Sequence, residues 1–228
     1  MMNTAMKRYV EEDWIKNFHP EKRRLTGRSY LIAKRFMDLT LVLLSSPMWV
    51  PFLGIIALFI AVTSPGAPVM FTQWRTGRGG KRFRMYKFRS MVPNAEELKM
   101  KYAHLNELQW PDFKITNDPR ITKVGKILRK TSLDELPQLI NILKGEMSLV
   151  GPRPIVQDEL KHYKKDSPVF LSVRPGLTGL WQVSGRSDLG YEERVNLDIY
   201  YVQNWSFWLD IKILIKTVGV VLKRRGAQ

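Results

Sequence analysis

The segment 131–154 reads TSLDELPQLINILKGEMSLVGPRP and combines acidic, apolar and turn-forming residues in a short space. Two adjacent carboxylates, Asp134 and Glu135, stand just before Pro137. The apolar positions of a predicted helix follow them, at Leu136, Leu139, Ile140 and Leu143. The turn Gly-Pro-Arg-Pro ends the segment at 151–154. Acidic side chains at a helix start, followed by an arginine in a rigid turn, suit a site for phosphate chemistry.

The same acidic pair also fits a helix cap. Ser132 followed by Glu135 matches a capping box, in which each side chain satisfies a free backbone N–H. With Ser132 as N-cap, however, Pro137 would be the fifth helical residue and would remove a hydrogen bond. With Asp134 as N-cap, Pro137 falls in the first turn, where a missing N–H costs little. Local spacing therefore leaves a capping and a catalytic interpretation of Asp134 open.

The composition restricts the class of partner. The chain has 228 residues, enough for one sizeable core, and its net charge of +16 implies an anionic partner. Nucleic acid, an anionic membrane and phosphorylated substrates all meet that description. The chain has no cysteine, which excludes disulfides and thiolate metal sites, and its three histidines show no ligand spacing.

A long apolar segment favours the membrane. Residues 39–62, LTLVLLSSPMWVPFLGIIALFIAV, carry no charge and are long enough to cross a hydrocarbon core of roughly 30 Å as a helix. Its centre holds Ser45, Ser46, Pro47 and Pro51, and two prolines in so short a span should break or bend a helix. A segment that bends and returns to the same face and an ordinary kinked spanning helix both fit this pattern.

The residues before this segment suit a membrane surface. Residues 1–29 have mixed charge and predict a basic tail or a short amphipathic helix. Lys34 and Arg35 stand immediately before the apolar segment, where they would meet anionic headgroups. Asp38 follows one helical turn after Lys34, and we expect it to pair with Lys34 or Arg35.

Two strands are predicted after the apolar segment, at 69–73 and 81–91, joined through Gly-Arg-Gly-Gly at 77–80 as a hairpin. No acidic residue occurs between Thr72 and Val92. The basic residues of this stretch are Arg75, Arg78, Lys81, Arg82, Arg84, Lys87 and Arg89. A solvated basic face is the ordinary explanation, whereas the neighbouring membrane segment favours a role in attracting phosphates.

Further helices are predicted by apolar spacing. They lie at 121–130, 155–165, 191–202 and 208–222, with a polar surface excursion at 93–117, a type II turn at 174–176 and strand and loop at 178–186. The helix at 208–222 is broadly apolar, but Lys212 and Lys216 fall on one narrow stripe with Lys223. That pattern is typical of a helix lying in the membrane interface.

Four blocks of the sequence resemble the bacterial sugar transferases, also called monotopic phosphoglycosyl transferases. The blocks are KRFMD at 34–38 leading into Ser46-Pro47, KFRSM at 87–91, DPRITKVGKILRKTSLDELPQLINILKGEMSLVGPRP at 118–154, and RPGLTGLWQVSGR at 174–186. The resemblance covers about residues 30–225. It is greatest to the branch that transfers glucose or galactose 1-phosphate from a UDP-hexose to undecaprenyl phosphate in surface polysaccharide synthesis.

The resemblance implies a fold and a location. The fold would be mainly α with a small β element, and the hydrophobic helix would be re-entrant, bent at Ser46 and Pro47. Residues 1–29 would form a basic tail, 30–66 the membrane-inserted helix, and 67–228 a compact catalytic unit ending in an interfacial helix. This monotopic protein would lie on the bacterial inner membrane, among its lipids, with the catalytic unit facing the cytoplasm.

The resemblance also implies a chemistry. Asp134 would be the nucleophile that attacks the β-phosphorus, expels UMP and forms a phosphosugar–aspartyl intermediate, which undecaprenyl phosphate then attacks. Asp134 and Glu135 would hold Mg²⁺, and Glu135 would also help position or deprotonate the acceptor. The residues expected to bind substrate phosphates are Arg129, Arg153, Arg186, Lys87 and Arg89.

Two other functions compete with this interpretation. An ordinary glycosyl transfer to a lipid phosphate would release UDP instead of UMP. A non-catalytic basic membrane scaffold would explain the charge, but it gives no reason for the acidic pair beside Arg129 and Arg153. We expect no nucleic-acid partner, and a homo-oligomer is compatible with the sequence. No residue can be tied to one hexose.

Overall fold

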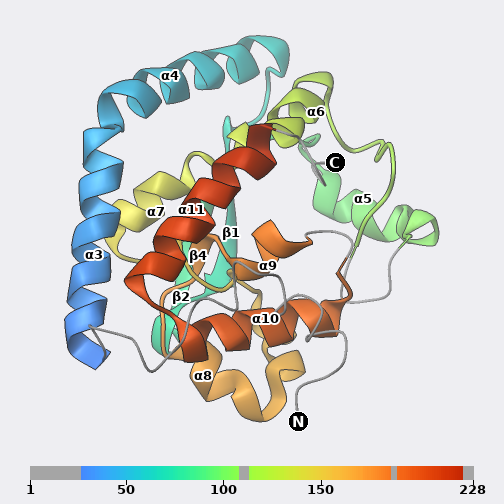
Figure 1. Ribbon diagram of the computed structural model, residues 1–228. Coiled ribbons are helices and arrows are strands. Elements are labelled where there is room, and N and C mark those ends of the chain that lie inside the picture. The colour runs from blue at the N-terminus through green and yellow to red at the C-terminus, as the bar shows by residue number, and fades with distance from the viewer. Residues whose placement is uncertain (1–26, 108–112, 186–188, 223–228) are drawn as a thin grey trace.

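The computed structural model describes residues 27–107, 113–185 and 189–222, and it is mainly helical with two small two-stranded sheets. This confirms the predicted class, mainly α with a small β element. Figure 1 shows the helices arranged around the short strands, with α3 and α4 along two sides of the view. The predicted tail at 1–29 lies outside the described residues, except for 27–29, which begin α3.

The helices and strands, many of which are labelled in Figure 1, occur along the chain in the following order. They are α3 (Gly27–Leu44), α4 (Ser46–Thr63), β1 (Met70–Thr76), η2 (Arg78–Gly80), β2 (Arg82–Phe88), α5 (Ala95–Lys101), η3 (Ala103–Leu105), α6 (Lys123–Lys130), η4 (Leu133–Glu135), α7 (Gln138–Lys144), β3 (Ser148–Val150), η5 (Gln157–Asp166), α8 (Ser167–Leu171), β4 (Gly176–Thr178), α9 (Leu180–Ser184), α10 (Tyr191–Asn204) and α11 (Phe207–Leu222). The η elements are 3₁₀ helices.

The apolar segment is sharply bent where the sequence predicted it. α3 and α4 meet at a steep angle (Figure 1), and the Ser45 and Ser46 hydroxyls donate to the carbonyls of Leu41 and Leu43, both at 2.7 Å. Pro47 lies in the first turn of α4, where its missing N–H costs little. The Ser46 hydroxyl therefore satisfies the Leu43 carbonyl, which Pro47 cannot. The Ser45 hydroxyl adds a second donor to the Leu41 carbonyl, which already accepts the Ser45 N–H at 3.1 Å.

α4 is the one helix in the described part of the chain that is long and apolar enough to cross a membrane by length and composition. Only 17% of it is buried, so it is not the core helix of the unit. Its large exposed side chains include Met48, Ile55, Leu58 and Val62. The re-entrant path of the apolar segment through the membrane stays a prediction. The division of the chain into a membrane-inserted part at 30–66 and a catalytic part at 67–228 also stays a prediction.

The first sheet is the predicted hairpin. β1 and β2 pair antiparallel with Thr72 opposite Tyr86, and η2 joins them. Phe83 and Met85 on β2 are buried against Val42 and Trp49 of the bent helices. The alternation of apolar and basic residues in this strand therefore places the apolar face toward the core.

Asn141 of α7 attaches this hairpin to the rest of the core. The side chain is fully buried, its Oδ1 accepts from the Tyr86 N–H at 3.0 Å, and its Nδ2 donates to the Arg84 carbonyl at 2.7 Å. Nδ2 also donates to the Glu146 carboxylate at 2.7 Å. A side-chain amide thus satisfies one peptide N–H and one peptide carbonyl of β2, a contact that the sequence did not predict.

The end of α7 is held by two arginines from distant segments. Arg35 of α3 donates to the carbonyls of Ile142 at 2.5 Å and Leu143 at 3.0 Å. Arg174, which precedes β4, donates to the Gly145 carbonyl at 2.7 Å. Cationic donors at the C-terminal end of a helix satisfy free carbonyls and complement its dipole.

The prediction that Asp38 pairs with Lys34 or Arg35 holds only as an electrostatic interaction with Lys34, because the hydrogen bonds of Asp38 go to other residues. Asp38 is buried, and its carboxylate accepts from the Ser148 hydroxyl at 2.7 Å and the Leu149 N–H at 3.2 Å. Asp38 therefore ties α3 to β3, because the donors of that strand lie closer to it than the cations on its own helix.

The second half of the chain differs from the prediction in two places. Residues 155–165 were expected to form an α-helix, but the chain forms the 3₁₀ helix η5 and then α8. Strand and loop were expected at 178–186, but the strand ends at Thr178 and the helix α9 follows. β3 and β4 pair in parallel, and the glycines at 151 and 176 approach so closely that a Cβ on Gly176 would lie 2.1 Å from the Gly151 nitrogen.

α10 and α11 complete the unit and confirm the two predicted C-terminal helices. Leu197, Tyr201, Leu209 and Ile213 pack into a shared core with β3 and α9. On its outer side α11 exposes an apolar stripe made of Trp208, Ile215, Val218 and Leu222. This stripe is consistent with the interfacial placement that the sequence predicted.

Candidate active site

The acidic pair lies in a separate turn and not at the start of α7. Leu133–Glu135 forms the 3₁₀ helix η4, and Pro137 is the N-cap of α7, which begins at Gln138. Ser132 has φ 56°, in the left-handed region, and its side chain makes no cap hydrogen bond. Both capping predictions, Ser132 with Glu135 and Asp134 as N-cap, are therefore wrong. The reason is that Ser132 reverses the chain into a 3₁₀ turn before Pro137.

Asp134 is a buried carboxyl beside several charges. It is 8% exposed, and burial raises its pKa to about 6. Lys87 and Arg129 act in the opposite direction, whereas the neighbouring Glu135 raises the pKa further. The carboxyl group has therefore lost much of the water that would stabilise its charge, and the two cations offset part of that loss.

Lys87 of β2 faces the acidic pair directly. Its Nζ donates to the Glu135 carboxylate at 2.6 Å, and both side chains are partly exposed. Lys87 is also the largest electrostatic influence that lowers the pKa of Asp134. The structure thus brings together the predicted cation of the KFRSM block and the predicted acids.

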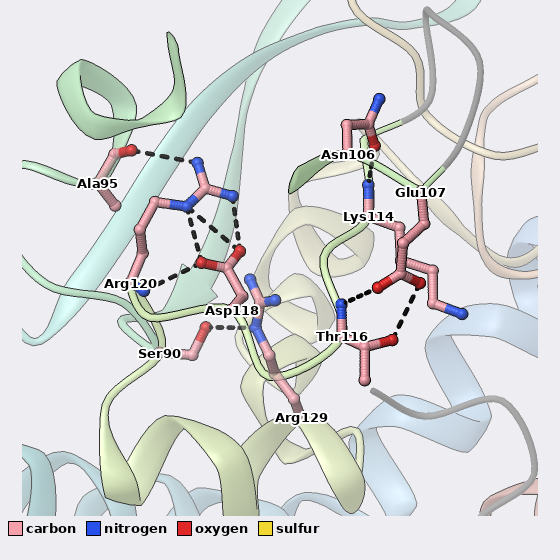
Figure 2. A network of polar contacts seen from close by, with 9 residues as sticks. All are labelled: Ser90, Ala95, Asn106, Glu107, Lys114, Thr116, Asp118, Arg120 and Arg129. Carbon is pink, nitrogen blue, oxygen red and sulfur yellow. Dashed lines mark hydrogen bonds and ion pairs between the residues drawn. The ribbon is translucent and has the colours of Figure 1, made fainter. Parts of the chain in front are cut away.

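Arg129 extends from α6 and is held in position by Ser90 (Figure 2). Its Nε donates to the Ser90 hydroxyl at 3.0 Å. Burial lowers its pKa, while the negative charges of Asp134 and Asp118 raise it. Figure 2 also shows the guanidinium of Arg120 donating hydrogen bonds to the Asp118 carboxylate, the shortest of them 2.7 Å long. The partly buried guanidinium of Arg129 is therefore attracted electrostatically by two carboxylates, those of Asp118 and Asp134.

Gly125 is what allows α6 to lie so close to this network. A Cβ at this position would stand 1.8 Å from the Ser90 carbonyl oxygen, so only glycine fits without moving the backbone. The Thr122 side chain caps the same helix by accepting from the Gly125 N–H at 2.9 Å. These contacts fix where Arg129 emerges from α6.

Two further arginines, Arg153 and Arg75, lie at the Gly-Pro-Arg-Pro turn. Arg153, in the Gly-Pro-Arg-Pro turn, lies over the Trp181 ring at 5.8 Å. Arg75 of β1 is largely buried and donates to the Pro154 carbonyl at 3.2 Å. Burial and the charge of Arg153 lower the pKa of Arg75 to about 10, with Glu159 and Glu135 opposing the shift.

Arg75 thus stands within electrostatic reach of Glu135 and of Arg153. The sequence offered no reason to prefer it, because it is one of many cations in the hairpin and we preferred Lys87 and Arg89. Only the pairing of β1 with β2 and the contact with Pro154 set it apart.

Arg89 makes no contact with the acidic pair among the described residues. Arg89 is buried and donates through Nη2 to the Ser64 carbonyl, at the C-terminal end of α4. Arg186 lies outside the described residues. The prediction that these two arginines bind phosphate therefore stays a prediction, and the visible contact of Arg89 is with the end of the apolar helix.

The acidic pair fits Mg²⁺ only with help from a substrate. Within residues 27–107, 113–185 and 189–222, no three His, Cys, Asp or Glu side chains gather as a metal site. Asp134 and Glu135 supply two carboxylates, and Mg²⁺ is usually held by one or two carboxylates, with phosphate oxygens and water completing its shell. The donor set is therefore of the kind that binds Mg²⁺ together with a nucleotide diphosphate.

Comparison with known proteins gives the family. The family model described as "Bacterial sugar transferase" matches residues 29–224. The chain belongs to the bacterial sugar transferase family. This confirms the resemblance carried by the four sequence blocks.

Several curated bacterial sugar transferases and related proteins are similar to the chain. The undecaprenyl-phosphate galactose phosphotransferase of Salmonella typhimurium is 50% identical over 214 residues, covering 90% of this chain and 44% of the relative. The UDP-galactose-lipid carrier transferase of Erwinia amylovora is 49% identical over 207 residues, covering 89% and 43%. The exopolysaccharide production protein ExoY of Rhizobium meliloti is 43% identical over 204 residues, covering 86% and 88%. The chain therefore spans less than half the length of the first two relatives.

Proposed function

We propose that the protein transfers hexose 1-phosphate from a UDP-hexose to undecaprenyl phosphate, giving undecaprenyl-diphospho-hexose and UMP. This would be the first membrane step in the synthesis of an exopolysaccharide, a capsule or an O-antigen. The observation that carries the proposal is a buried carboxyl, Asp134, between Lys87 and Arg129 inside a matched family block. The names of the relatives, two of which refer to galactose and a lipid carrier, support the substrate class.

Asp134 is proposed to act as nucleophile. One of its oxygens attacks the β-phosphorus of UDP-hexose while the bond from that phosphorus to the bridging oxygen breaks, and UMP leaves with the electron pair. An oxygen of undecaprenyl phosphate then attacks the same phosphorus and displaces the carboxylate of Asp134. Each step forms and breaks one P–O bond, and the enzyme returns to its starting state.

The surrounding cations would offset the charge of the phosphates. Lys87 and Arg129 are already within electrostatic reach of Asp134, and Arg153 and Arg75 extend the basic surface along the neighbouring turn. Bound Mg²⁺ would neutralise phosphate charge that otherwise repels a carboxylate nucleophile. Glu135, paired with Lys87 at 2.6 Å, would keep the Lys87 ammonium beside the site. Its carboxylate would also bind the metal together with Asp134.

The proposal includes a position at the membrane. The exposed apolar side chains of α4 and the exposed stripe of α11 would enter the same leaflet of the bacterial inner membrane, with the catalytic unit facing the cytoplasm. A lipid phosphate could then reach the site from the membrane surface without leaving the bilayer. This monotopic arrangement is supported by the bend between α3 and α4 (Figure 1).

The test is an assay of Asp134→Asn with UDP-hexoses, undecaprenyl phosphate and Mg²⁺, with release of UMP as the readout. We expect the variant to lose turnover by a factor of at least about 10³ and to lose any covalent sugar-phosphate adduct on the protein. Asp158→Asn, which changes an exposed carboxylate of η5, is the matched control and should retain activity.

Full activity of Asp134→Asn would contradict the proposed mechanism. Release of UDP in place of UMP would identify an ordinary glycosyl transfer. If no UDP-hexose is turned over by the unaltered protein, while it still binds anionic vesicles, the scaffold function would replace the enzyme.

A further inference from the structure

The outer edge of β1 carries peptide groups that point away from the hairpin. On the opposite edge, Asn141 accepts from the Tyr86 N–H and donates to the Arg84 carbonyl, so these groups of β2 point away from β1. Their partners across the ladder are Thr72 and Trp74. Two residues that lie opposite each other in an antiparallel pair direct their peptide groups either both inward or both outward. The N–H and C=O groups of Thr72 and Trp74 therefore point outward from β1.

This part of the edge is open. Thr76, two residues after Trp74 and on the same side of the strand, donates its outward N–H to the Ile155 carbonyl at 2.8 Å. Among the described residues, no hydrogen bond reaches the peptide groups of Thr72 or Trp74, and both residues are exposed. The chain at Ile155 thus extends the sheet by one bridge and then leaves the edge.

A cleft of about 560 Å³ lies along the open edge. One wall is formed by residues 71–76 of β1, and other walls come from Glu96 of α5 and from residues 156–158. Residues 156–158 follow directly on Ile155, so the cleft lies on the side to which the open peptide groups point. Its volume is within the range of small-molecule sites, roughly 300–1,000 Å³.

The cleft adjoins the proposed reaction site. Phe71 lines the cleft and lies opposite Lys87 in the ladder, and Lys87 pairs with Glu135 at 2.6 Å. Arg75 lines the same cleft, and its charge interacts with that of Glu135. A substrate that reacts at the acidic pair can therefore extend from there along β1.

The open peptide groups lie some distance from the acidic pair. Trp74 is three residues from Phe71, which is roughly 10 Å along a strand. In UDP-hexose a ribose and the α-phosphate separate the uracil from the β-phosphorus. The base therefore has to bind away from Asp134, and the cleft offers a place for it beside the open edge.

Asn141 shows how one planar amide fits an edge of this kind. Its carbonyl accepts from the Tyr86 N–H, and its NH₂ donates to the carbonyl two residues earlier, at Arg84. The corresponding groups on β1 are the Trp74 N–H and the Thr72 carbonyl, since the two strands share this alternation. Uracil likewise presents a C=O beside an N–H in one plane, on the edge by which proteins read a free base.

A peptide strand is the other ligand that adds to a sheet edge. Here the bridge between Thr76 and Ile155 occupies one end of the edge, so the open groups within the cleft are those of Thr72 and Trp74. Strands average about 5–6 residues. The open stretch is therefore short for a peptide strand but sufficient for one ring.

We infer that the uracil of UDP-hexose binds in this cleft, with a ring carbonyl accepting from the Trp74 N–H and its N3–H donating to the Thr72 carbonyl. The inference rests on the proposed function, because it places another part of the same substrate. The indole of Trp74 is a separate source of contact, since it is 47% exposed and the guanidiniums of Arg82 and Arg84 lie over it at 5.2 Å and 5.1 Å.

The test separates the peptide N–H of Trp74 from its indole ring. Trp74→Ala removes the ring and keeps the N–H, whereas Trp74→Pro removes both. Proline is tolerated in an edge strand where the N–H points away from the ladder. UMP release is measured for each protein with UDP-hexose and with its N3-methyluridine analogue, and thermal unfolding checks that each variant is folded.

We expect N3-methylation to raise the KM of the unaltered protein for the sugar nucleotide by about tenfold or more, because it removes the donor to Thr72. Trp74→Pro should have a KM for UDP-hexose about tenfold above that of Trp74→Ala, because only the N–H distinguishes them as donors. The KM for undecaprenyl phosphate should be the same in the two variants.

The inference is overturned if the unaltered protein turns over UDP-hexose but N3-methylation leaves its KM within about twofold. Equal KM values for Trp74→Ala and Trp74→Pro would overturn it as well. Absence of turnover by the unaltered protein would instead contradict the proposed function, on which the inference rests.

If Trp74→Pro does not fold, hydrogen exchange of the unaltered protein decides the question. UMP should slow exchange of the Trp74 amide, because that N–H becomes hydrogen-bonded, whereas N3-methyl-UMP should slow it much less. An exchange rate that UMP leaves unchanged would show that the base binds elsewhere and would overturn the inference.

Discussion

Replacing Asp210 by Asn should loosen the attachment of α3 to α10 and α11. Asp210 lies in the first turn of α11 and is completely buried. Its Oδ2 accepts from the Tyr30 hydroxyl at 2.5 Å and from Lys34 Nζ at 2.8 Å, and its Oδ1 accepts from the Tyr201 hydroxyl at 2.6 Å. One carboxylate thus joins α3, α10 and α11.

The expected loss follows from these three contacts. An amide has one oxygen, so at least one of the three donors faces an NH₂ group that cannot accept from it. The Lys34 side chain, only 12% exposed, also loses its counter-charge. Removing one partner of a buried ion pair typically costs about 3–5 kcal/mol. For a chain of this size that corresponds to a fall in Tm of about 10 °C.

The assay is thermal unfolding of the purified protein in detergent, followed by circular dichroism. Glu192→Gln, an exposed acid on α10, is the control and should change stability by less than about 0.5 kcal/mol. The double variant Lys34→Met with Asp210→Asn should be less destabilised than the sum of the single variants, because no uncompensated charge remains. If Asp210→Asn unfolds at the same temperature as the control, the buried network does not hold the helices together.

Three further predictions follow from buried contacts. Asn141→Leu leaves a peptide N–H and a carbonyl of β2 without partners. It should lower the free energy of unfolding, measured by denaturant titration, by about 2–5 kcal/mol. An unchanged denaturation midpoint would contradict this role of Asn141. Asp198 holds its proton in the folded state with a pKa of about 8 but has an ordinary pKa when unfolded, so its contribution to stability is lost as pH rises toward 8. Wild type should therefore lose up to about 3 kcal/mol more than Asp198→Asn between about pH 5.5 and 8, and equal slopes of unfolding free energy against pH would refute the assignment. Gly125→Ala should push α6 away from Ser90 and lower both Tm and UMP release. The control is Gly79→Ala, where the new methyl group meets no atom and strain at positive φ is the only penalty.

Local patterns in the sequence predicted the elements that depend on neighbouring residues. The hairpin, α6 and α10 each show a regular apolar spacing, and the Ser-Pro pair marked the bend. The turn at η4 could not be predicted in this way. Serine rarely adopts the left-handed conformation that Ser132 has, so spacing alone favoured a cap.

Contacts between distant residues were the other source of differences. Asp210 meets Tyr30 and Lys34 across 180 and 176 residues, and Asp38 meets Ser148 across 110. Nothing in the local sequence of these acids distinguishes a buried partner from a surface charge. Within the site, the family blocks indicated Asp134, Lys87 and Arg129, whereas the position of Arg75 depends on how β1 pairs with β2 and meets Pro154.

The end of α7 has a consequence for how the protein is made. Arg35 leaves the ribosome well before this helix, but Arg174 follows Gly145 by 29 residues. A helix of seven residues is too short to persist by itself in water, so α7 needs both arginines and the strands beside it. During synthesis α3 and α4 are therefore complete before the acidic pair acquires its final surroundings, which depend on a residue 29 positions beyond Gly145.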